Sequence, residues 1–419
     1  AAFSCATPDA PLPEKQESAA TTMTLFQAVN PQNSKITFQN TINETIEQNV
    51  VAYDYLYNGA GIGVADFDHN GYPDLFFAGN QVGDELYLNQ GDFTFKEVSN
   101  SAGISEHGGW STGVSVVDIN GDGWTDIYVC RSGPTKKGAD KKNKLFVNNQ
   151  NGTFTEQAES YGLAYNGHST QAVFVDFDLD GDLDCYLLTH PGSFKNRIDS
   201  KTLQEQIRSG LLESDVIFVN ENGRFRDVSR EAGINDFAFG LGVVVSDVNL
   251  DGLPDIYVSN DFDEGDFLYV NKGNFNFEQM STRLLKHTSN YGMGCDFGDF
   301  NNDGWPDLLT LDMAFENHER SKRNMATMNP QKFNALVQLG WHYQYMVNTL
   351  QRNNGNGTFS DVAQISGVHQ TDWSWAGLFA DFDMDGQQDI FITNGYKRDT
   401  KDNDLEYKVQ KLQEEKGNS

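Results

Sequence analysis

Six short acidic segments hold the residue types and the spacing best suited to chemistry in this sequence. Each follows the nine-residue pattern Asp-x-Asp/Asn-x-Asp/Asn-Gly-x-x-Asp, and the copies occupy residues 66–74, 118–126, 176–184, 247–255, 299–307 and 381–389. Oxygens at positions 1, 3, 5, 7 and 9 around a sharp turn at the glycine form a calcium loop, because Ca²⁺ takes about six to eight hard oxygen ligands. The sequence therefore predicts about six bound Ca²⁺ ions, one in each segment.

The expected ligands are side-chain oxygens, except at position 7, where a main-chain carbonyl faces the ion. They are Asp66, Asp68, Asn70, Tyr72, Asp74, Asp118, Asn120, Asp122, Trp124, Asp126, Asp176, Asp178, Asp180, Asp182, Asp184, Asp247, Asn249, Asp251, Leu253, Asp255, Asp299, Asn301, Asp303, Trp305, Asp307, Asp381, Asp383, Asp385, Gln387 and Asp389. Asp, Asn and Gly also form ordinary tight turns, but six copies in register favour metal binding. Carboxylates at this density repel one another without a cation, so we expect structural ions coupled to folding.

The residues around each acidic segment repeat as well. A glycine-rich alternating run precedes the segment, a β-branched and aromatic run follows it, a third run ends in Asn and a fourth contains Phe. Strands rather than EF-hand helices therefore flank the loops. Four short strands with turn signals between them, repeated around an axis, predict an all-β propeller of four-stranded blades. The count favours six blades, or seven if an insertion hides a degenerate blade.

The two ends of the chain are expected to close one blade together. Residues 25–38 read like a hairpin of the third and fourth strands, and the last repeat supplies only a first and a second strand, within 377–393. Joining these strands closes the ring and removes exposed sheet edges. The expected organisation is an N-terminal tail over 1–23, a propeller over 24–397 and a charged tail, with a short solvated helix, over 398–419.

The composition limits the choice of partners and location. The chain of 419 residues has 60 acidic and 30 basic residues, so its formal net charge of −30 argues against nucleic acid or an anionic membrane surface as the ligand. No apolar run reaches the roughly 18 residues of a membrane-spanning helix. Cys130, Cys185 and Cys295 lie in apolar runs and are expected to be buried. Cys5 precedes a polar stretch and resembles the acylated residue of a bacterial lipoprotein, with a cloning remnant as the alternative. We therefore expect an extracytoplasmic protein, attached to the bacterial outer membrane or the cell surface only through a lipid anchor.

The repeats resemble the FG-GAP/VCBS family, whose propellers include the head of the integrin α-subunit. Residues 57–80, 109–130, 169–188 and 371–399 carry the resemblance, which covers roughly residues 24–400. It is strongest to the bacterial cartilage-acidic-protein-like group, often found with an ASPIC/UnbV module, although six repeats depart from the seven of integrins. The resemblance implies a calcium-binding propeller and leaves the activity open, because such propellers serve adhesion, sugar binding and, in some cases, catalysis.

The face opposite the acidic loops is the expected ligand face. Insertions between the second and third strands of three blades, at 131–144, 189–216 and 312–349, all extend this face, and Asn329 before Pro330 indicates a helix in the third. The 131–144 insertion has six basic residues and one acidic residue, which either steer an anionic partner or form a solvated loop.

Aromatic and histidine side chains are expected near the axis of the same face. There they could stack on a sugar or hold a peptide side chain, or they could pack between blades. These residues are Tyr57, Trp110, His168, Tyr291, Trp373 and Trp375, whereas Phe239, at an equivalent position, is expected in the core.

Two classes of function fit these observations. The first is a non-enzymatic, calcium-stabilised binding or adhesion module, or a part of an outer-membrane protein complex, with a protein or glycan ligand. The alternative is a propeller enzyme that acts on a polysaccharide, for example as a lyase, with His168, His190, Tyr291 or Arg197 in acid–base roles. The sequence contains no nucleophile elbow, phosphate loop or zinc motif. A single histidine is more often structural, so the sequence favours the binding module.

Overall fold

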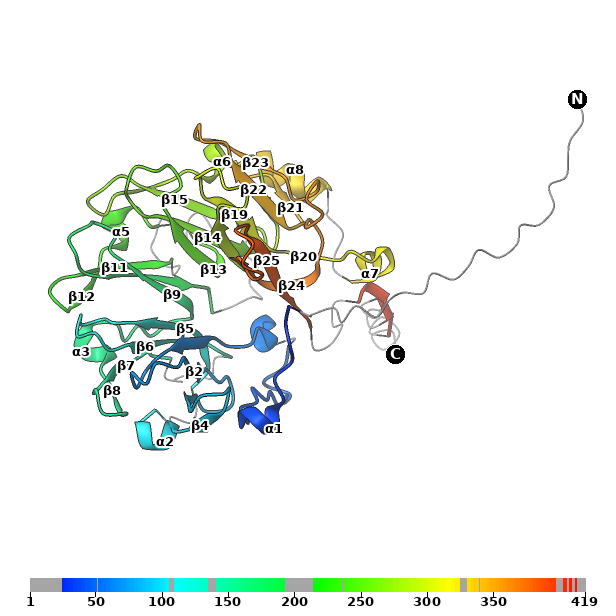
Figure 1. The fold of residues 1–419 in the computed structure, drawn as a ribbon. Coiled ribbons are helices and arrows are strands. Elements are labelled where there is room, and N and C mark those ends of the chain that lie inside the picture. The colour runs from blue at the N-terminus through cyan, green and yellow to red at the C-terminus, as the bar shows by residue number, and fades with distance from the viewer. Residues whose placement is uncertain are drawn as a thin grey trace, which may run out of the picture.

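Six β-sheets stand around a central axis as the blades of a propeller in the computed structural model (Figure 1). The structure describes residues 25–50, 52–104, 109–134, 141–192, 214–235, 237–324, 330–338 and 340–396, with a few positions between 402 and 412. Within each of the first five blades the strands follow one another in chain order, antiparallel, from the axis outward, and we number them first to fourth. The predicted six-bladed, all-β propeller is confirmed.

The first three blades have the most regular strands. Their bounds are β1 Ile62–Ala65, β2 Asp74–Phe77, β3 Glu85–Asn89 and β4 Phe95–Glu97; β5 Ser111–Val117, β6 Asp126–Arg131, β7 Lys144–Asn148 and β8 Phe154–Glu156; and β9 Ser169–Val175, β10 Asp184–Thr189, β11 Val216–Asn220 and β12 Phe225–Asp227. The second strands β6 and β10 are buried along their whole length. They read as continuous apolar runs because neighbouring blades cover both of their faces.

The fourth and fifth blades have the same four-stranded pattern, and the sixth blade differs from it. Their bounds are β13 Phe239–Ser246, β14 Asp255–Asp261, β15 Phe267–Asn271 and β16 Phe277–Gln279; β18 Cys295–Gly298, β19 Asp307–Thr310, β22 Thr349–Asn353 and β23 Phe359–Asp361; and, in the sixth blade, β24 Asp372–Ala380 and β25 Asp389–Asn394. The two-residue strand β20, Met313–Ala314, joins the sixth blade beside β24. A separate parallel pair links β17 Thr288–Ser289 to β21 Gln344–Tyr345.

Short helices follow the outer strands and occupy one insertion. They are η1 Asp54–Tyr57, a 3₁₀ turn, and the α-helices α1 Pro31–Ser34, α2 Ser99–Ala102, α3 Ala158–Tyr161, α5 Ser229–Ala232, α6 Ser281–Leu284, α7 His318–Arg323 and α8 Pro330–Gln338. The predicted helical insertion in 312–349 is thus confirmed as α7 and α8.

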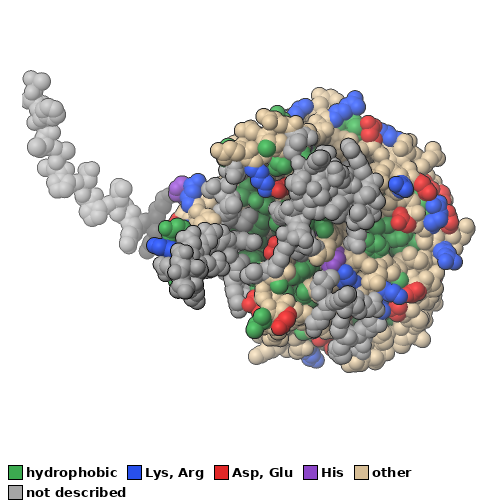
Figure 2. All heavy atoms as spheres, turned by 180° about the vertical axis from the view of Figure 1, so that it is seen from behind, with side chains coloured by type: hydrophobic (Ala, Val, Ile, Leu, Met, Phe, Trp, Pro, Cys, Tyr) green, Lys and Arg blue, Asp and Glu red, His purple; other side chains and the backbone are tan. Residues whose placement is uncertain are grey.

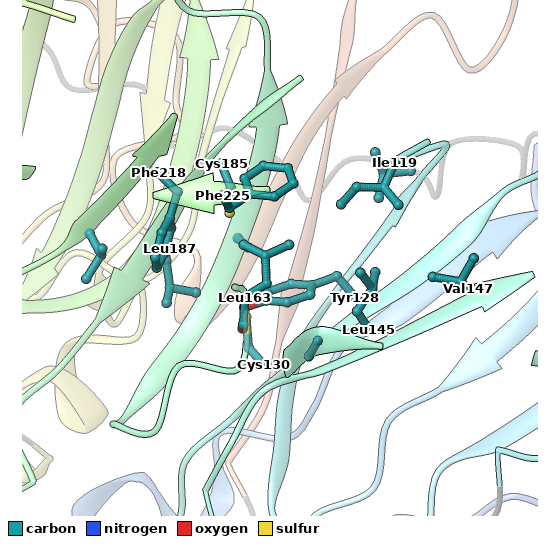
Figure 3. Close-up of a cluster of buried hydrophobic side chains, with 14 residues drawn as sticks. Ile119, Tyr128, Cys130, Leu145, Val147, Leu163, Cys185, Leu187, Phe218 and Phe225 are labelled. Atoms are coloured by element: carbon teal, nitrogen blue, oxygen red, sulfur yellow. The ribbon is translucent and has the colours of Figure 1, made fainter. Parts of the chain in front are cut away.

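The hydrophobic core lies between blades rather than in one central volume. Figure 3 shows one such cluster, in which Tyr128 and Leu145 of the second blade meet Cys185 and Phe218 of the third. Cys130 and Cys185 are free and fully buried, as the apolar runs predicted, whereas Cys295, also expected to be buried, is only half-buried because it lines the central cavity. Burial raises the pKa of the Cys130 thiol well above its ordinary value, so this cysteine serves as a small apolar side chain.

The N-terminal segment does not form the predicted hairpin. Among the described residues, none of 25–38 pairs as a strand with β25, and Pro31–Ser34 form helix α1 instead. Proline cannot donate to a sheet ladder, and the Asn30 side chain accepts the main-chain N–H of Gln32 to cap the helix. The segment nevertheless reaches the sixth blade, where the Phe26 ring packs on Phe382 with 5.5 Å between centroids.

The remaining sequence-based expectations concern the ends of the chain. Cys5 and most of the C-terminal tail lie outside the described residues, but the described positions 403–404, 407–408 and 411–412 are helical, in agreement with the solvated helix expected there. Within the described part of the tail, Asp402 accepts a hydrogen bond from Arg323 of α7 at 2.7 Å. No helix in the described residues is long and apolar enough to span a bilayer.

Candidate functional site

The six acidic segments form six loops of one geometry, each joining the first and second strands of a blade; we call them the repeat loops. In every loop the carboxylate at position 1 accepts the main-chain N–H groups of positions 5 and 6, and the oxygens at positions 3 and 5 accept those of positions 5 and 7, over 2.7–3.2 Å. The loop backbone therefore fixes its own oxygens before any ligand binds. Each of these oxygens keeps a second lone pair for a cation.

The repeat loops depend on a left-handed backbone at two positions. The glycine at position 6 has φ between 87° and 100° in all six loops, and in none of them would a Cβ meet another atom within 4 Å. Backbone conformation rather than space therefore requires glycine there. Position 4 is also left-handed, and five of its six residues are not glycine, for example Leu179 with φ of 62° and Met384 with φ of 60°.

The loops collect hard oxygen donors at short range. One oxygen from each of Asp66, Asp68 and Asp74 lies within 4.8 Å of the other two, and Asp176, Asp178 and Asp184 repeat this arrangement in the third blade. In the sixth blade Asp381, Asp383 and Asp385 form a similar group. Carboxylate and carbonyl oxygens in groups of this size suit a hard divalent cation, and the donor set therefore fits the ion that the sequence predicted.

The aspartate at position 9 has a second, structural task that the sequence did not reveal. Asp126 is fully buried, and its two carboxylate oxygens accept the main-chain N–H of Ile119 at 3.1 Å and that of Asn148 at 2.7 Å. This carboxylate thus joins the repeat loop to the third strand of the same blade. Burial raises its pKa to about 6, which the two hydrogen bonds partly offset.

At the opposite end of the blades, a short plug crosses the axis. It consists of residues 53–57, which include η1, and it meets the central cavity of about 550 Å³ that the first strands line. Tyr55 donates to Asp261 at 3.1 Å, and the Tyr57 ring lies 6.5 Å from that of Tyr396, so the plug reaches both the fourth and the sixth blade. Figure 2 shows hydrophobic side chains gathered toward the middle of the disc.

A buried polar network anchors the plug to the second and third blades. The Ser132 hydroxyl lies 2.8 Å from Nε2 of His190, 3.0 Å from Nδ1 of His168 and 3.2 Å from the Tyr53 hydroxyl. Ser132, His168 and His190 are each no more than 4% exposed. Enzymes that use a serine nucleophile also place a histidine nitrogen beside it. The positions of the protons therefore decide whether these groups could act in catalysis or hold the structure.

The outer partners of the two histidines fix their tautomers. The Pro191 carbonyl, 2.9 Å from Nδ1 of His190, can only accept, so Nε2 of His190 accepts from Ser132. The Lys141 ammonium, 2.8 Å from Nε2 of His168, can only donate, so Nδ1 of His168 donates to Ser132. Every polar atom of this network therefore has its partner inside the protein.

Burial, helped by the neighbouring Lys141, lowers the pKa of His168 to about 3 and that of His190 to about 4. Both are neutral in the folded protein at pH 7, whereas an unfolded histidine titrates near pH ~6.5. Between pH ~4 and ~6.5 the unfolded chain therefore binds more protons than the folded protein. The free energy of unfolding falls as the pH drops through this range.

We expect His190→Gln to reduce this acid destabilisation by about 1.6 kcal/mol between pH 6.5 and 5, because the full slope of about 1.4 kcal/mol per pH unit applies only below pH ~6. Urea unfolding at both pH values, in the same calcium concentration, measures the difference. The exposed His318→Gln serves as the control and should leave the difference unchanged. An unaltered difference in His190→Gln would contradict a neutral, buried His190.

The residues expected at the ligand face do gather around the axis, mostly as packing. Trp110 lies edge to face with Tyr53, and Trp373, 5% exposed, stacks on Tyr396 at 4.1 Å. His168 belongs to the buried network. Tyr57, Trp110, Tyr291 and Trp375 are only half-buried, so part of each ring remains accessible. Phe239 is in the core as expected, and Arg197 lies outside the described residues.

The basic insertion offers less free charge than its composition suggested. Arg131 is 5% exposed, Lys142 and Lys144 face Glu159 and Glu156, and Lys141 contacts His168. Among the described residues of this insertion, the cations therefore hold local structure rather than forming an open anion site.

Sequence reasoning missed the plug and the network beneath it. The alternating tyrosines of "YDYLY", placed just before the first blade, were the available signal for the plug. Ser132 and Asp261 carried no signal, because isolated polar residues after a strand are common in loops.

These features define the class of protein: a six-bladed β-propeller whose blades carry aspartate-rich loops at one end and a plugged axis at the other. The chain belongs to the family of FG-GAP-like repeat proteins, whose family model matches residues 43–129, 135–187, 247–310 and 338–392. The resemblance seen in the repeats is thereby confirmed.

Curated relatives are similar to this chain over most of its length. Cartilage acidic protein 1 of Mus musculus is 24% identical over 379 residues, covering 80% of this chain and 57% of that protein. Its Xenopus tropicalis counterpart is 24% identical over 353 residues, covering 80% of this chain and 48% of that protein. The chain thus spans about half the length of these relatives.

Two solved structures illustrate the wider neighbourhood of the fold. An Agrocybe aegerita lectin described as recognising non-reducing terminal N-acetylglucosamine has a TM-score of 0.42 and 17% identity, over 79% of this chain and 73% of the lectin. An exo-inulinase from Aspergillus awamori has a TM-score of 0.32 and 11% identity, over 75% of this chain and 66% of the enzyme.

Proposed function

We propose that this protein is a calcium-stabilised binding or assembly module without catalytic activity. Its face opposite the repeat loops binds a protein or glycan ligand. One observation carries the proposal: the repeat loops and the long insertions lie at opposite ends of the blades. The antiparallel order of the strands places every loop between first and second strands at one end and every connection between second and third strands at the other. The end with the repeat loops can therefore hold ions, while the opposite end carries insertions of different length and sequence.

Calcium would be held by positions 1, 3, 5, 7 and 9 of each repeat loop, for example by Asp66, Asp68, Asn70, the Tyr72 carbonyl and Asp74. When bound, it neutralises the carboxylates that the loop brings together and so stabilises the closed hairpin. The support is the shared geometry of the six loops and the grouping of their oxygens within 4.8 Å.

The buried network argues for binding rather than catalysis. Ser132 is enclosed beneath the plug and its hydroxyl proton goes to His190, while His168 already has Lys141 and Ser132 as partners. A substrate would have to displace the plug before it reached these groups. The structure therefore supports structural roles for both histidines, and a polysaccharide-cleaving enzyme becomes an outcome to be tested.

A glycan array combined with pull-down from bacterial surface extracts tests the ligand face. We expect a hit whose affinity falls at least about tenfold in Trp375→Ala or Tyr291→Ala, because an aromatic ring stacked on a ligand contributes on the order of 1–3 kcal/mol. Tyr72→Ala, an exposed aromatic at the repeat-loop end, is the matched control and should bind normally.

Release of cleaved sugar from any glycan on the array would contradict the non-enzymatic proposal. If all three variants bind the ligand with equal affinity, the ligand does not bind at this face. Melting curves of each variant show whether a loss of binding reflects a loss of folding.

We also propose an extracytoplasmic location at a cell surface or bacterial outer membrane, with Cys5 acylated. The support is the sequence around Cys5 alone. Labelling of cells with a fatty acid, compared between the native protein and Cys5→Ala, tests this assignment.

A further inference from the structure

A second cavity, of about 230 Å³, lies between the fourth and fifth blades beside their repeat loops. Its wall on the fourth blade includes Val248 and Asn249, at positions 2 and 3 of the repeat loop, and Lys272, which follows β15. Its wall on the fifth blade includes Trp305, at position 7 of the next repeat loop, and Phe359 of β23. The cavity lies at the repeat-loop end of the blades, so it is distinct from the ligand face.

Two small residues leave this space open. In the preceding interface, between the third and fourth blades, position 2 of the repeat loop is Phe177, and the ring of Phe275 packs against the core that these blades share. The corresponding residues between the fourth and fifth blades are Val248 and Gly357, and both line the cavity. The cavity therefore occupies the place that aromatic rings fill one interface earlier.

The turns that carry Phe275 and Gly357 are equivalent. The segments 271–277 and 353–359 have the same length, and a pair of Asn with Phe closes each of them. Phe275 has φ of 52° and Gly357 has φ of 76°, so both adopt a left-handed backbone. A Cβ at Gly357 would meet no other atom within 4 Å. The fifth blade thus has room for the side chain that the fourth blade carries.

The first two interfaces between blades are filled by other side chains. Phe67, at position 2 of the first repeat loop, belongs to the core between the first and second blades. Ile119 takes the same position in the second loop, and Tyr161 packs against the core between the second and third blades. Among the interfaces of the first five blades, the combination of Val248 with Gly357 is the smallest, which explains the cavity at this place.

The lining favours a flat, uncharged ring. Trp305 and Phe359 offer aromatic surface, and Met280 offers a polarisable sulfur. An apolar cavity of about 150 Å³ is enough for benzene, so this cavity holds a ring with a small substituent. A charged ligand would lose its hydration against these apolar walls. The ammonium group of Lys272 already faces Glu278 at 3.9 Å.

The size of the cavity favours a free molecule over a protein partner. The exposed side chains of its lining, Asn249 and Lys272, are polar, so its apolar part is recessed and of the size of one ring. A specific protein interface typically buries about 800 Å² on each partner. A small molecule therefore suits the cavity better than a protein surface does.

From these observations we infer that the cavity between the fourth and fifth blades is a binding site for a small neutral aromatic molecule, such as a substituted phenol. The ring lies between Trp305 and Phe359 of the fifth blade and Val248 of the fourth. Its polar substituent points to the mouth, toward Asn249 and Lys272. The bound ring replaces the side chain that Phe275 supplies in the preceding interface.

A titration of the 419-residue protein with 4-fluorophenol, followed by ¹⁹F NMR, tests this site. We expect one bound molecule per chain, with a dissociation constant of roughly 1 mM or tighter for so small a ligand. Cyclohexanol has a similar size but no aromatic face, so it should displace the probe several-fold less effectively than phenol does. If 4-fluorophenol does not bind the native protein, the inference is wrong.

A variant that fills the cavity locates the bound probe. Gly357→Phe combined with Thr358→Asn makes residues 355–359 identical in sequence to residues 273–277 of the fourth blade. The added ring should occupy the cavity and weaken binding of 4-fluorophenol at least about tenfold. The matched control is Gly152→Phe with Thr153→Asn in the second blade, and it should bind the probe as the native protein does.

A second variant fills the same space from the other wall. Val248→Phe introduces the residue that four of the six repeat loops carry at position 2, and it should weaken binding similarly. The Tm of both filled variants should stay at or above the native value, because the added rings enter free space rather than a packed core. Equal binding in the native protein and both filled variants would place the probe elsewhere and overturn the inference. A Tm that falls by several degrees in both would do the same, since the space would then not exist.

Discussion

Chelation of calcium with EGTA is expected to lower the Tm by about 15 °C or more, and added Ca²⁺ is expected to restore it. A site at 100 times its dissociation constant stabilises the folded state by about 2.7 kcal/mol, so six repeat loops together contribute on the order of 16 kcal/mol. A domain of this size shifts its Tm by roughly 1–2 °C for each kcal/mol. Differential scanning fluorimetry across a calcium titration measures the effect.

Magnesium is the control for this experiment. Mg²⁺ requires a smaller, near-octahedral site and gives up its water reluctantly, so it should restore much less of the Tm than Ca²⁺ at equal concentration. A Tm that does not change with chelator would show that the loop hydrogen bonds suffice by themselves. The repeat loops would then be turns rather than metal sites.

Asp126→Ala is expected to destabilise the protein by about 2–6 kcal/mol, because two buried N–H groups, those of Ile119 and Asn148, lose their acceptors and each costs about 1–3 kcal/mol. The matched variant is Asp389→Ala. It removes a carboxylate from the same loop position at a half-buried site, where among the described residues it accepts the N–H of Phe382, so it should cost about 1 kcal/mol.

Both substitutions remove one expected calcium ligand, so the difference between them isolates the connection between repeat loop and third strand. Urea unfolding at saturating Ca²⁺ gives both values. If the two variants lose equal stability, position 9 acts through the metal alone. The larger loss in Asp126→Ala would identify it as the carboxylate that ties a loop to its blade.

A good part of the fold follows from the spacing of a few residues. The six acidic segments, their flanking strands and the insertions could be assigned because tight turns and short strands depend on neighbours in the chain. The identical hydrogen bonds of the six repeat loops show why: each loop satisfies its own backbone within nine residues. Helix α8 was likewise predictable from Pro330, which is compatible with a first helical position.

The N-terminal segment shows where this reasoning ends. Residues 25–38 resemble a hairpin, yet whether they form one depends on a strand to pair with, and Pro31 and Asn30 turn the chain into α1 instead. The aromatic residues near the axis were ambiguous for the same reason. Trp373 and Trp375 are two residues apart, but contacts with Tyr396 and Phe315 bury the first, whereas the second stays partly accessible.

The sequence by itself determined the blades, the repeat loops and the end of the molecule at which each lies, since these depend on local turns and on strand order. Only the tertiary structure decided that a tyrosine plug crosses the axis, that Ser132, His168 and His190 form one buried network, and that residues 25–38 form a helix rather than a hairpin beside β25. The physical reason is that burial and pairing across the ring join residues far apart in the chain. Their spacing in the sequence carries no record of that proximity.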